Sequence, residues 1–144
     1  MIQLNDSIII SRKPREVFAF IADLSNIPKW QAEVVTSKVT TTGPTRVGSR
    51  FTEEVKMGPM RASASCEVTE FSPGKTMGFK ALSPSIDYEG RVIVESSENG
   101  TKLTLAGSVQ PKGFWKLMQP MMKGEFKSAI KKELVAVKEI LERM

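Results

Sequence analysis

The sequence predicts an α+β fold: an antiparallel β-sheet of about seven strands, covered on one side by a long C-terminal helix. Two observations support this prediction. Apolar residues alternate with a period of two from residue 32 to 110, and Gly- or Pro-containing turns interrupt the region at short intervals. After Pro111 the apolar period becomes helical. Because the strands then have one apolar face and the helix one apolar stripe, the two must cover each other.

The first thirty residues predict one strand and two short helices. Residues 2–10 are β-branched near their end and predict a strand. Pro14 marks the start of a helix, because the fixed φ of proline suits the first turn. Ser25 or Asn26 can cap a second short helix, which carries Trp30.

Six further strands are predicted, each ended by a turn signal. The strongest hairpin signal is Asn99-Gly100, because both residue types tolerate positive φ. The predicted strands are Glu33–Thr42, Ser49–Met57, Arg61–Phe71, Thr76–Leu82, Asp87–Ser96 and Thr101–Val109.

The residues expected on the inner face of the sheet are often small. Ala62, Ala64 and Cys66 share one face of their strand, and Gly90 and Gly107 lie on the inner faces of the last two strands. Small side chains leave space beneath a sheet, so the sequence predicts room between the sheet and the C-terminal helix.

The C-terminal segment predicts a helix of about twenty residues. Pro120 marks its first turn, and a short helical segment over 114–119 precedes it. Its apolar stripe consists of Met118, Met122, Phe126, Ile130, Leu134, Val137 and Leu141.

Composition excludes several kinds of chemistry. The 144 residues predict a single domain, 1–144, with 40% hydrophobic and 26% charged residues. The chain has no histidine and one cysteine, so Ser-His and Cys-His nucleophile pairs are excluded and a zinc site is not expected. The sequence has no glycine-rich phosphate loop. We therefore expect no cofactor and no metal.

The sequence predicts a cytoplasmic protein. No apolar run approaches the length of a membrane-spanning helix, the N-terminus does not resemble a secretory signal, and Cys66 alone cannot form an internal disulfide. The formal charge is +5, with lysines spread through the C-terminal segment. A basic face can attract nucleic acid or anionic lipid. We interpret it instead as a solvated helix face, because Glu125, Glu133, Glu139 and Glu142 are interspersed.

Four motifs in order resemble the START-like, or SRPBCC, superfamily. "PREVFAFIADLSNIPKW" (14–30) is similar to its first-helix signature. "GPTRVGSRF" (43–51), "VTEFSPGKTMGF" (68–79) and "NGTKLTL" (99–105) are similar to its polyketide cyclase/dehydrase-like branch. The resemblance implies the helix-grip (Bet v 1-like) fold, with a hydrophobic cavity between sheet and C-terminal helix. Members bind lipids, sterols, polyketides, plant hormones or quinones, and some are enzymes.

Glu53 and Tyr88 are the candidate polar residues of this cavity. Period two places Glu53 on the inner face, where burial would raise its pKa, although the open rim or a bulge could leave it in water. Tyr88 offers either a hydrogen-bond donor to a ligand or a core aromatic ring. Cys66 lacks an obvious base and is interpreted as a small buried hydrophobe. Family enzymes often have His or Arg in the cavity, and the inner faces here offer neither, which argues against catalysis.

We expect the protein to bind a hydrophobic small molecule, such as a lipid or polyketide, without catalysis. The first alternative is a cyclase or dehydratase that uses Glu53 and Tyr88, and the second is an adaptor for a protein partner. Nucleic-acid binding and stable membrane insertion are not expected, and the chain is expected to be a monomer or homodimer. The predicted ligand-binding residues are Trp30, Phe51, Glu53, Val55, Cys66, Val68, Phe79, Tyr88, Val92, Leu105, Trp115, Met118, Met122 and Phe126.

Overall fold

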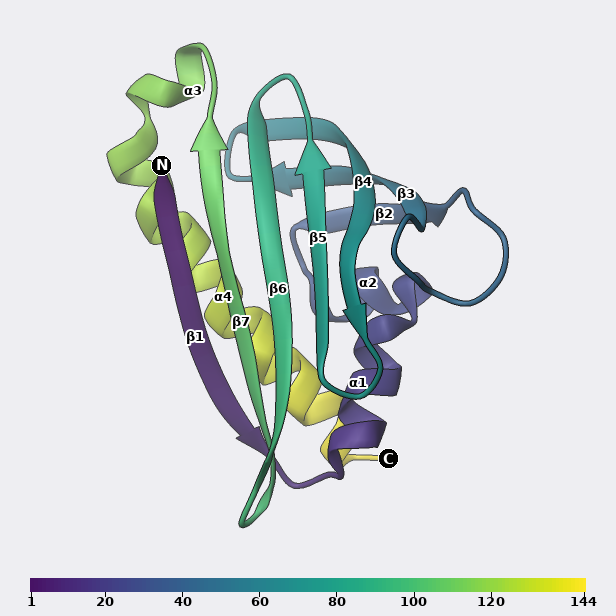
Figure 1. The fold of residues 1–144 in the computed structure, drawn as a ribbon. Helices are drawn as coiled ribbons and strands as arrows, with labels where there is room; N and C mark the ends of the chain where they lie inside the picture. Colours follow the sequence, from purple (N-terminus) through teal and green to yellow (C-terminus); the bar gives the residue numbers. More distant parts are fainter.

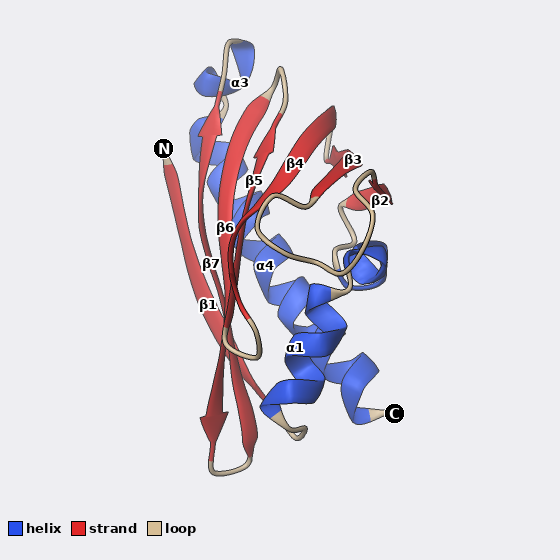
Figure 2. Ribbon diagram, turned by 45° about the vertical axis from the view of Figure 1, so that its right-hand side comes forward, coloured by secondary structure: helices blue, strands red, loops and turns tan.

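The computed structural model describes residues 1–144, except for the side chain of Met60. Seven antiparallel strands form one curved sheet in the order β1-β7-β6-β5-β4-β3-β2. The helices all lie on one side of it (Figures 1 and 2). The strands are β1 Ile2–Ile10, β2 Val34–Val39, β3 Arg50–Met57, β4 Met60–Ser72, β5 Thr76–Leu82, β6 Ile86–Ser97 and β7 Gly100–Pro111. The helices are α1 Pro14–Ala22, the 3-10 turn η1 Leu24–Asn26, α2 Ile27–Trp30, α3 Phe114–Leu117 and α4 Gln119–Glu142.

The predicted fold class is therefore confirmed. β1 and β5 have the predicted bounds, and the ends of the other strands differ from the prediction by up to three residues. The largest difference is in β2, which ends at Val39 instead of Thr42. The chain turns at Gly43, whose φ of 85° favours glycine, so the preceding threonines already belong to the loop. Thr40 keeps only one backbone hydrogen bond to the Arg50 carbonyl, at 2.9 Å.

Asn26 occupies the N-cap position of α2, one of the two positions predicted, but it makes no capping hydrogen bond. Asp23 caps the 3-10 turn: its carboxylate accepts from the Ser25 backbone N–H at 3.1 Å and from the Ser25 hydroxyl at 2.6 Å. Asn26 precedes α2, but its side chain makes no cap and donates to the Phe20 carbonyl at 3.0 Å. An aspartate two residues before a backbone N–H closes this turn readily, and the serine hydroxyl then becomes a second donor.

The long helix α4 supplies one wall of the core. It begins at Gln119, with Pro120 in its first turn as predicted. Its apolar stripe is buried against the sheet from Met122 to Leu141, and Met118, one residue before the helix, is half-buried. Each fully buried Leu, Ile or Met contributes about 1.5–3 kcal/mol to folding. No helix of the described chain is long and apolar enough to cross a membrane.

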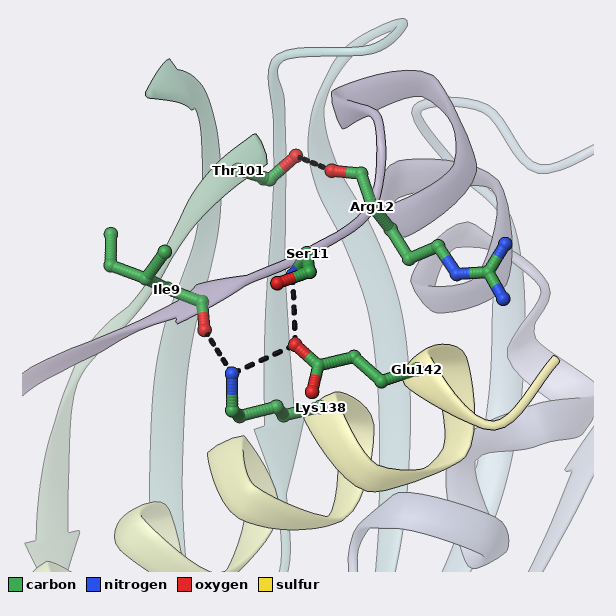
Figure 3. A network of polar contacts seen from close by, with 6 residues as sticks. All are labelled: Ile9, Ser11, Arg12, Thr101, Lys138 and Glu142. Atoms are coloured by element: carbon green, nitrogen blue, oxygen red, sulfur yellow. Dashed lines mark hydrogen bonds and ion pairs between the residues drawn. The ribbon is translucent and has the colours of Figure 1, made fainter. Parts of the chain in front are cut away.

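Polar contacts fasten the C-terminal end of α4 to the start of the chain (Figure 3). The Lys138 ammonium donates to the Ile9 carbonyl at 2.7 Å and to Glu142 Oε2 at 2.8 Å, and the Ser11 backbone N–H donates to the same oxygen at 2.8 Å. Lys138 and these hydrogen bonds lower the pKa of Glu142. Within the described residues, the first half of α4 has no side-chain hydrogen bond or ion pair of this kind.

Candidate ligand-binding cavity

The inner face of the sheet presents small side chains opposite the first half of α4. The register sets Cys66 of β4 beside Ala81 of β5, and Ala81 beside Tyr88 of β6. On β3, Glu53 pairs with Ala64. Since most of these side chains are small, the surface between β3 and β6 is hollow.

A partly open cavity of about 80 Å³ lies in this hollow. A water molecule needs about 10–15 Å³ of such space, so the cavity has room for several waters. It is smaller than the roughly 300–1,000 Å³ of a drug-sized ligand site. The walls come from β1, from the α2–β2 segment, from β3 to β6 and from α4. Figure 1 shows how these elements are arranged. The lining residues are Leu4, Gln31, Glu33, Val34, Glu53, Val55, Met57, Ala62, Ala64, Phe79, Ala81, Ser83, Ile86, Tyr88, Phe126, Ala129, Ile130 and Glu133.

A larger, open hollow of about 1150 Å³ has a different character. Its lining includes Lys80, Glu89 and Arg91, which alternate with the inward-facing residues of their strands, and Lys127 and Lys131 of α4. Seven charged residues line it, whereas small-molecule sites typically have only a few polar groups among apolar walls. The cavity of about 80 Å³ is therefore the candidate site.

Tyr88 lies over two glycines that pair across neighbouring strands. Gly90 of β6 is opposite Gly107 of β7. A Cβ atom on Gly90 would lie 2.7 Å from Tyr88 Cε1, and one on Gly107 would lie 2.9 Å from the Tyr88 hydroxyl oxygen. The ring also contacts Phe79, with ring centroids 5.7 Å apart. The two glycines thus make space for the ring at the cavity wall.

The Tyr88 hydroxyl remains protonated at neutral pH. Burial, and then the nearby charges of Glu133, Glu33 and Glu53, raise its pKa above the ordinary value. A phenol that keeps its proton is a hydrogen-bond donor. Tyr88 can therefore donate to an oxygen or nitrogen atom of a molecule in the cavity.

Glu53 is half-buried on the inner face of β3, as period two predicts. Burial raises the pKa of its carboxyl from 4.5 to about 7; a hydrogen bond from the Cys66 thiol opposes this rise, and the charge of Glu33 adds to it. Glu53 therefore exists in both protonation states near neutral pH. Burial and the neighbouring Glu53 in turn raise the pKa of the Cys66 thiol, so this cysteine is a poor nucleophile.

Glu133 on α4 and Glu33 before β2 bring two more carboxyl groups to the cavity. Only 8% of the surface of Glu133 is exposed. Burial raises the pKa of Glu133 well above its ordinary value, and a hydrogen bond with Glu33 and the charges of Glu33 and Glu53 raise it further. Like charges at this buried site therefore favour the protonated form of Glu133. Among the described residues, no set of three His, Cys, Asp or Glu side chains is arranged to hold a metal ion.

The cluster of methionines at the start of α4 encloses a second, smaller space of about 40 Å³. Trp115, Met118, Met121 and Met122 form its helical side, and the β3–β4 turn closes it. Met57 lines both this space and the main cavity. Met57 is therefore the side chain shared by the two spaces.

The predicted ligand-binding residues fall into three groups in the structure. Those that line the main cavity are Glu53, Val55, Phe79, Tyr88 and Phe126. Those that line the smaller space are Trp115, Met118 and Met122. The remaining residues are buried in the core without lining either space: Trp30, Phe51, Cys66, Val68, Val92 and Leu105.

Sequence reasoning missed the carboxyl groups of Glu33 and Glu133. Glu133 had been interpreted as part of a solvated helix face, and this was wrong. It is three residues after Ile130 and four before Val137, so helical spacing already placed it on the buried face. Glu33 lies in the connection before β2, where no periodic pattern indicates the direction of a side chain.

A sheet curved around a long C-terminal helix, with an apolar cavity between them, defines a START-like helix-grip domain. The sequence matches the family model described as polyketide cyclase/dehydrase and lipid transport over residues 1–142. The chain therefore belongs to this family, and the resemblance found in the sequence motifs is confirmed.

Solved structures show the same fold at low sequence identity. A START superfamily protein from Mycobacterium smegmatis has a TM-score of 0.80 and 12% identity, with 98% of this chain and 97% of that chain covered. The Zhui aromatase/cyclase from Streptomyces sp. R1128 has a TM-score of 0.79 and 11% identity, with 98% and 93% covered. A hypothetical protein from Helicobacter pylori has a TM-score of 0.79 and 12% identity, with 96% and 86% covered. The comparison with curated proteins gave no match.

Proposed function

We propose that this protein binds a hydrophobic small molecule between the sheet and α4, and that it does so without changing the molecule chemically. The observation that carries the proposal is the mainly apolar cavity between the sheet and α4, in which a few polar groups converge. This combination is typical of small-molecule sites. Removal of apolar ligand surface from water would drive binding, at about 25 cal/mol per Å² before ordering costs.

The polar groups of the cavity favour a ligand that is neutral or basic at its buried end. Glu33, Glu53 and Glu133 contribute carboxyl groups and Tyr88 a hydroxyl, whereas the described lining contains no lysine or arginine. A ligand carboxylate would meet like charges without a cation to compensate them. A hydroxyl, carbonyl or amine can instead form hydrogen bonds with Tyr88 or with a carboxyl in either protonation state.

The environment of these groups also supports binding without catalysis. The raised pKa of the Cys66 thiol removes it as a nucleophile near neutral pH. The raised pKa of Tyr88 keeps its proton in place, so it is suited to donate a hydrogen bond and not to act as a base.

Head-group preference can be measured with three ligands that share one alkyl chain. 1-Octanol, octylamine and octanoate would compete with a neutral hydrophobic dye for the purified protein. We expect octanol and octylamine to displace the dye and octanoate to fail. Displacement by octanoate at the lowest concentration of the three would contradict the proposed chemistry of the buried end.

A cavity-filling variant tests the location. Ala64 lines the cavity, so the larger side chain of Ala64→Leu would occupy part of the space that the dye needs. This variant should bind the dye about tenfold or more weakly. Ser65→Leu is the matched control, because Ser65 is the exposed neighbour on the opposite face of β4. Urea unfolding shows whether each variant folds. An equal loss in both variants, or none in a folded Ala64→Leu protein, would place binding elsewhere.

A second candidate function is a cyclase or dehydratase, and the carboxyl of Glu53 favours it. A general acid–base group works best with a pKa near the operating pH, and that of Glu53 is about 7. Tyr88, in the same cavity, could polarise a substrate carbonyl. Turnover of a polyketide-type substrate would support the enzyme over the carrier if its pH–rate profile showed an ionisation near pH 7. That ionisation should be absent from the profile of Glu53→Gln.

A further inference from the structure

The whole formal charge of the protein is concentrated in one segment. Residues 112–132 contain six lysines and one glutamate, a net charge of +5, which equals the net charge of the complete chain. The remainder of the protein is therefore balanced. Of these lysines, Lys116, Lys123, Lys127, Lys131 and Lys132 are exposed, and none of them forms an ion pair within the described residues.

The same segment exposes large apolar side chains at one corner of the molecule. Phe114, Leu117 and Met121 are exposed to 65%, 80% and 56%, and we call these three residues the α3 corner. Figures 1 and 2 show α3 projecting at the end of the molecule farthest from the C-terminus. The short helix α3 buries none of its four residues, although Phe114 packs edge-to-face on Trp115. An isolated exposed apolar residue is ordinary, but three within the eight residues 114–121, on α3 and the start of α4, indicate an interaction surface.

We propose that the α3 corner docks on the surface of a membrane that contains anionic lipid. Phe114, Leu117 and Met121 would enter the boundary between head groups and acyl chains. The exposed lysines, Lys116 and Lys123 first, would interact with the anionic head groups. This interaction surface is independent of the ligand that the cavity takes.

The chemistry of the corner fits a bilayer better than other partners. Interfacial segments combine Phe, Leu or Trp with lysines, whose stems extend so that the charge reaches the head groups. Protein interfaces are depleted in lysine at their core. A nucleic acid could bind the lysines through its phosphates, but phosphates make no favourable contact with three exposed apolar side chains.

The position of the corner relates docking to the cavities. Met121 is both part of the α3 corner and a wall of the smaller space, which shares Met57 with the main cavity. The opposite end of α4 is fastened by Lys138 and Glu142 to the β1–α1 connection (Figure 3). The surface that would meet the bilayer thus lies at the end of α4 that, among the described residues, makes no side-chain hydrogen bond to the sheet.

Vesicle co-sedimentation tests the proposal with the full chain. The probes are phosphatidylcholine vesicles with and without about 30% phosphatidylglycerol. We expect binding only to the anionic vesicles at about 0.1 M NaCl, and much weaker binding at about 0.5 M NaCl. Lys116→Gln with Lys123→Gln should lower the partition coefficient about tenfold or more, and so should Phe114→Ser with Leu117→Ser.

Matched controls separate the corner from general charge and hydrophobicity. Lys38→Gln with Lys102→Gln removes the same charge from two exposed lysines elsewhere, and Val47→Ser removes an exposed apolar side chain from another loop. Both controls should bind as the unmodified protein does. Failure to bind anionic vesicles, or equal losses in the controls, would overturn the proposal. So would light scattering that shows a dimer which the Phe114→Ser, Leu117→Ser variant converts to monomer, because the corner would then be an interface between two copies.

Discussion

Replacement of Glu53 by glutamine should make the protein more stable at neutral and alkaline pH. The carboxyl has a pKa of about 7 in the folded protein and about 4.5 when unfolded. Below both values it is protonated in both states and contributes nothing. Between them, the unfolded chain gives up the proton first, so stability falls as pH rises and the penalty is complete above pH 7. A difference of 2.5 between these two values corresponds to about 3 kcal/mol.

The free energy of unfolding in urea, measured from about pH 5 to about pH 8, gives the effect of this carboxyl. Over this range Glu53 alone should destabilise the unmodified protein by about 2.5 kcal/mol, and Glu53→Gln should lack this contribution. Glu133 adds a slope of the same sign, because its pKa is raised too. The quantity that isolates Glu53 is therefore the difference between the two proteins. Glu54→Gln is the control, since Glu54 is the exposed neighbour on the same strand.

Two results would refute this reasoning. Equal pH dependence in Glu53→Gln and the unmodified protein would mean that the Glu53 carboxyl stays hydrated. A variant clearly less stable at about pH 8 would mean that the ionised carboxylate makes a hydrogen bond on which folding depends. In either case the acid–base role considered for Glu53 would lose its physical basis.

Three further predictions follow from the geometry of the cavity and the core. Gly90→Ala should lower the free energy of unfolding in urea by about 1–3 kcal/mol, because its Cβ would lie 2.7 Å from Tyr88 Cε1. Gly124→Ala, at an exposed position of α4, should raise it by up to about 1 kcal/mol in the same assay. Thr101→Val should cost about 1–2 kcal/mol in the same assay, since the buried hydroxyl donates to the Arg12 carbonyl at 2.6 Å. Tyr88→Phe should weaken octanol binding about three- to tenfold in dye displacement and leave stability nearly unchanged, and an unaltered affinity would show that the hydroxyl faces no ligand.

The fold was predictable because its sequence signals are local and repeated. Apolar residues alternate over six strands, and the C-terminal helix has a single long apolar stripe. Both apolar faces are buried when the helix packs on the sheet. The resemblance of 14–30 and three later segments to the START-like superfamily then specified the topology. The exact ends of β2 and the cap at Asp23 were not predictable, because turns there depend on which of several neighbouring polar residues accepts the hydrogen bond.

The candidate site was only partly predictable, because it depends on how far each inward residue lies from α4. Period two identified Glu53 and Tyr88 as inward-facing but could not separate cavity lining from core. Val92 and Leu105 share that inner face, yet both are packed in the core. The carboxyl of Glu33 is positioned by a connection, and contact between distant segments of this kind leaves no periodic signal in the sequence.

The size of the cavity bears on how a ligand could enter. At about 80 Å³ it must expand before it holds an organic molecule of ordinary size, and the elements differ in how easily they can yield. The strands are joined by continuous backbone ladders, and the end of α4 near Glu142 is fastened by charged hydrogen bonds. The first half of α4 rests on Met122 and Phe126, and the neighbouring wall contains Met57. Methionine is unbranched and can adopt several rotamers at low cost. Among the described residues, a shift of the first half of α4 away from the sheet therefore breaks packing contacts and no side-chain hydrogen bond of that half, whereas expansion elsewhere would break hydrogen bonds.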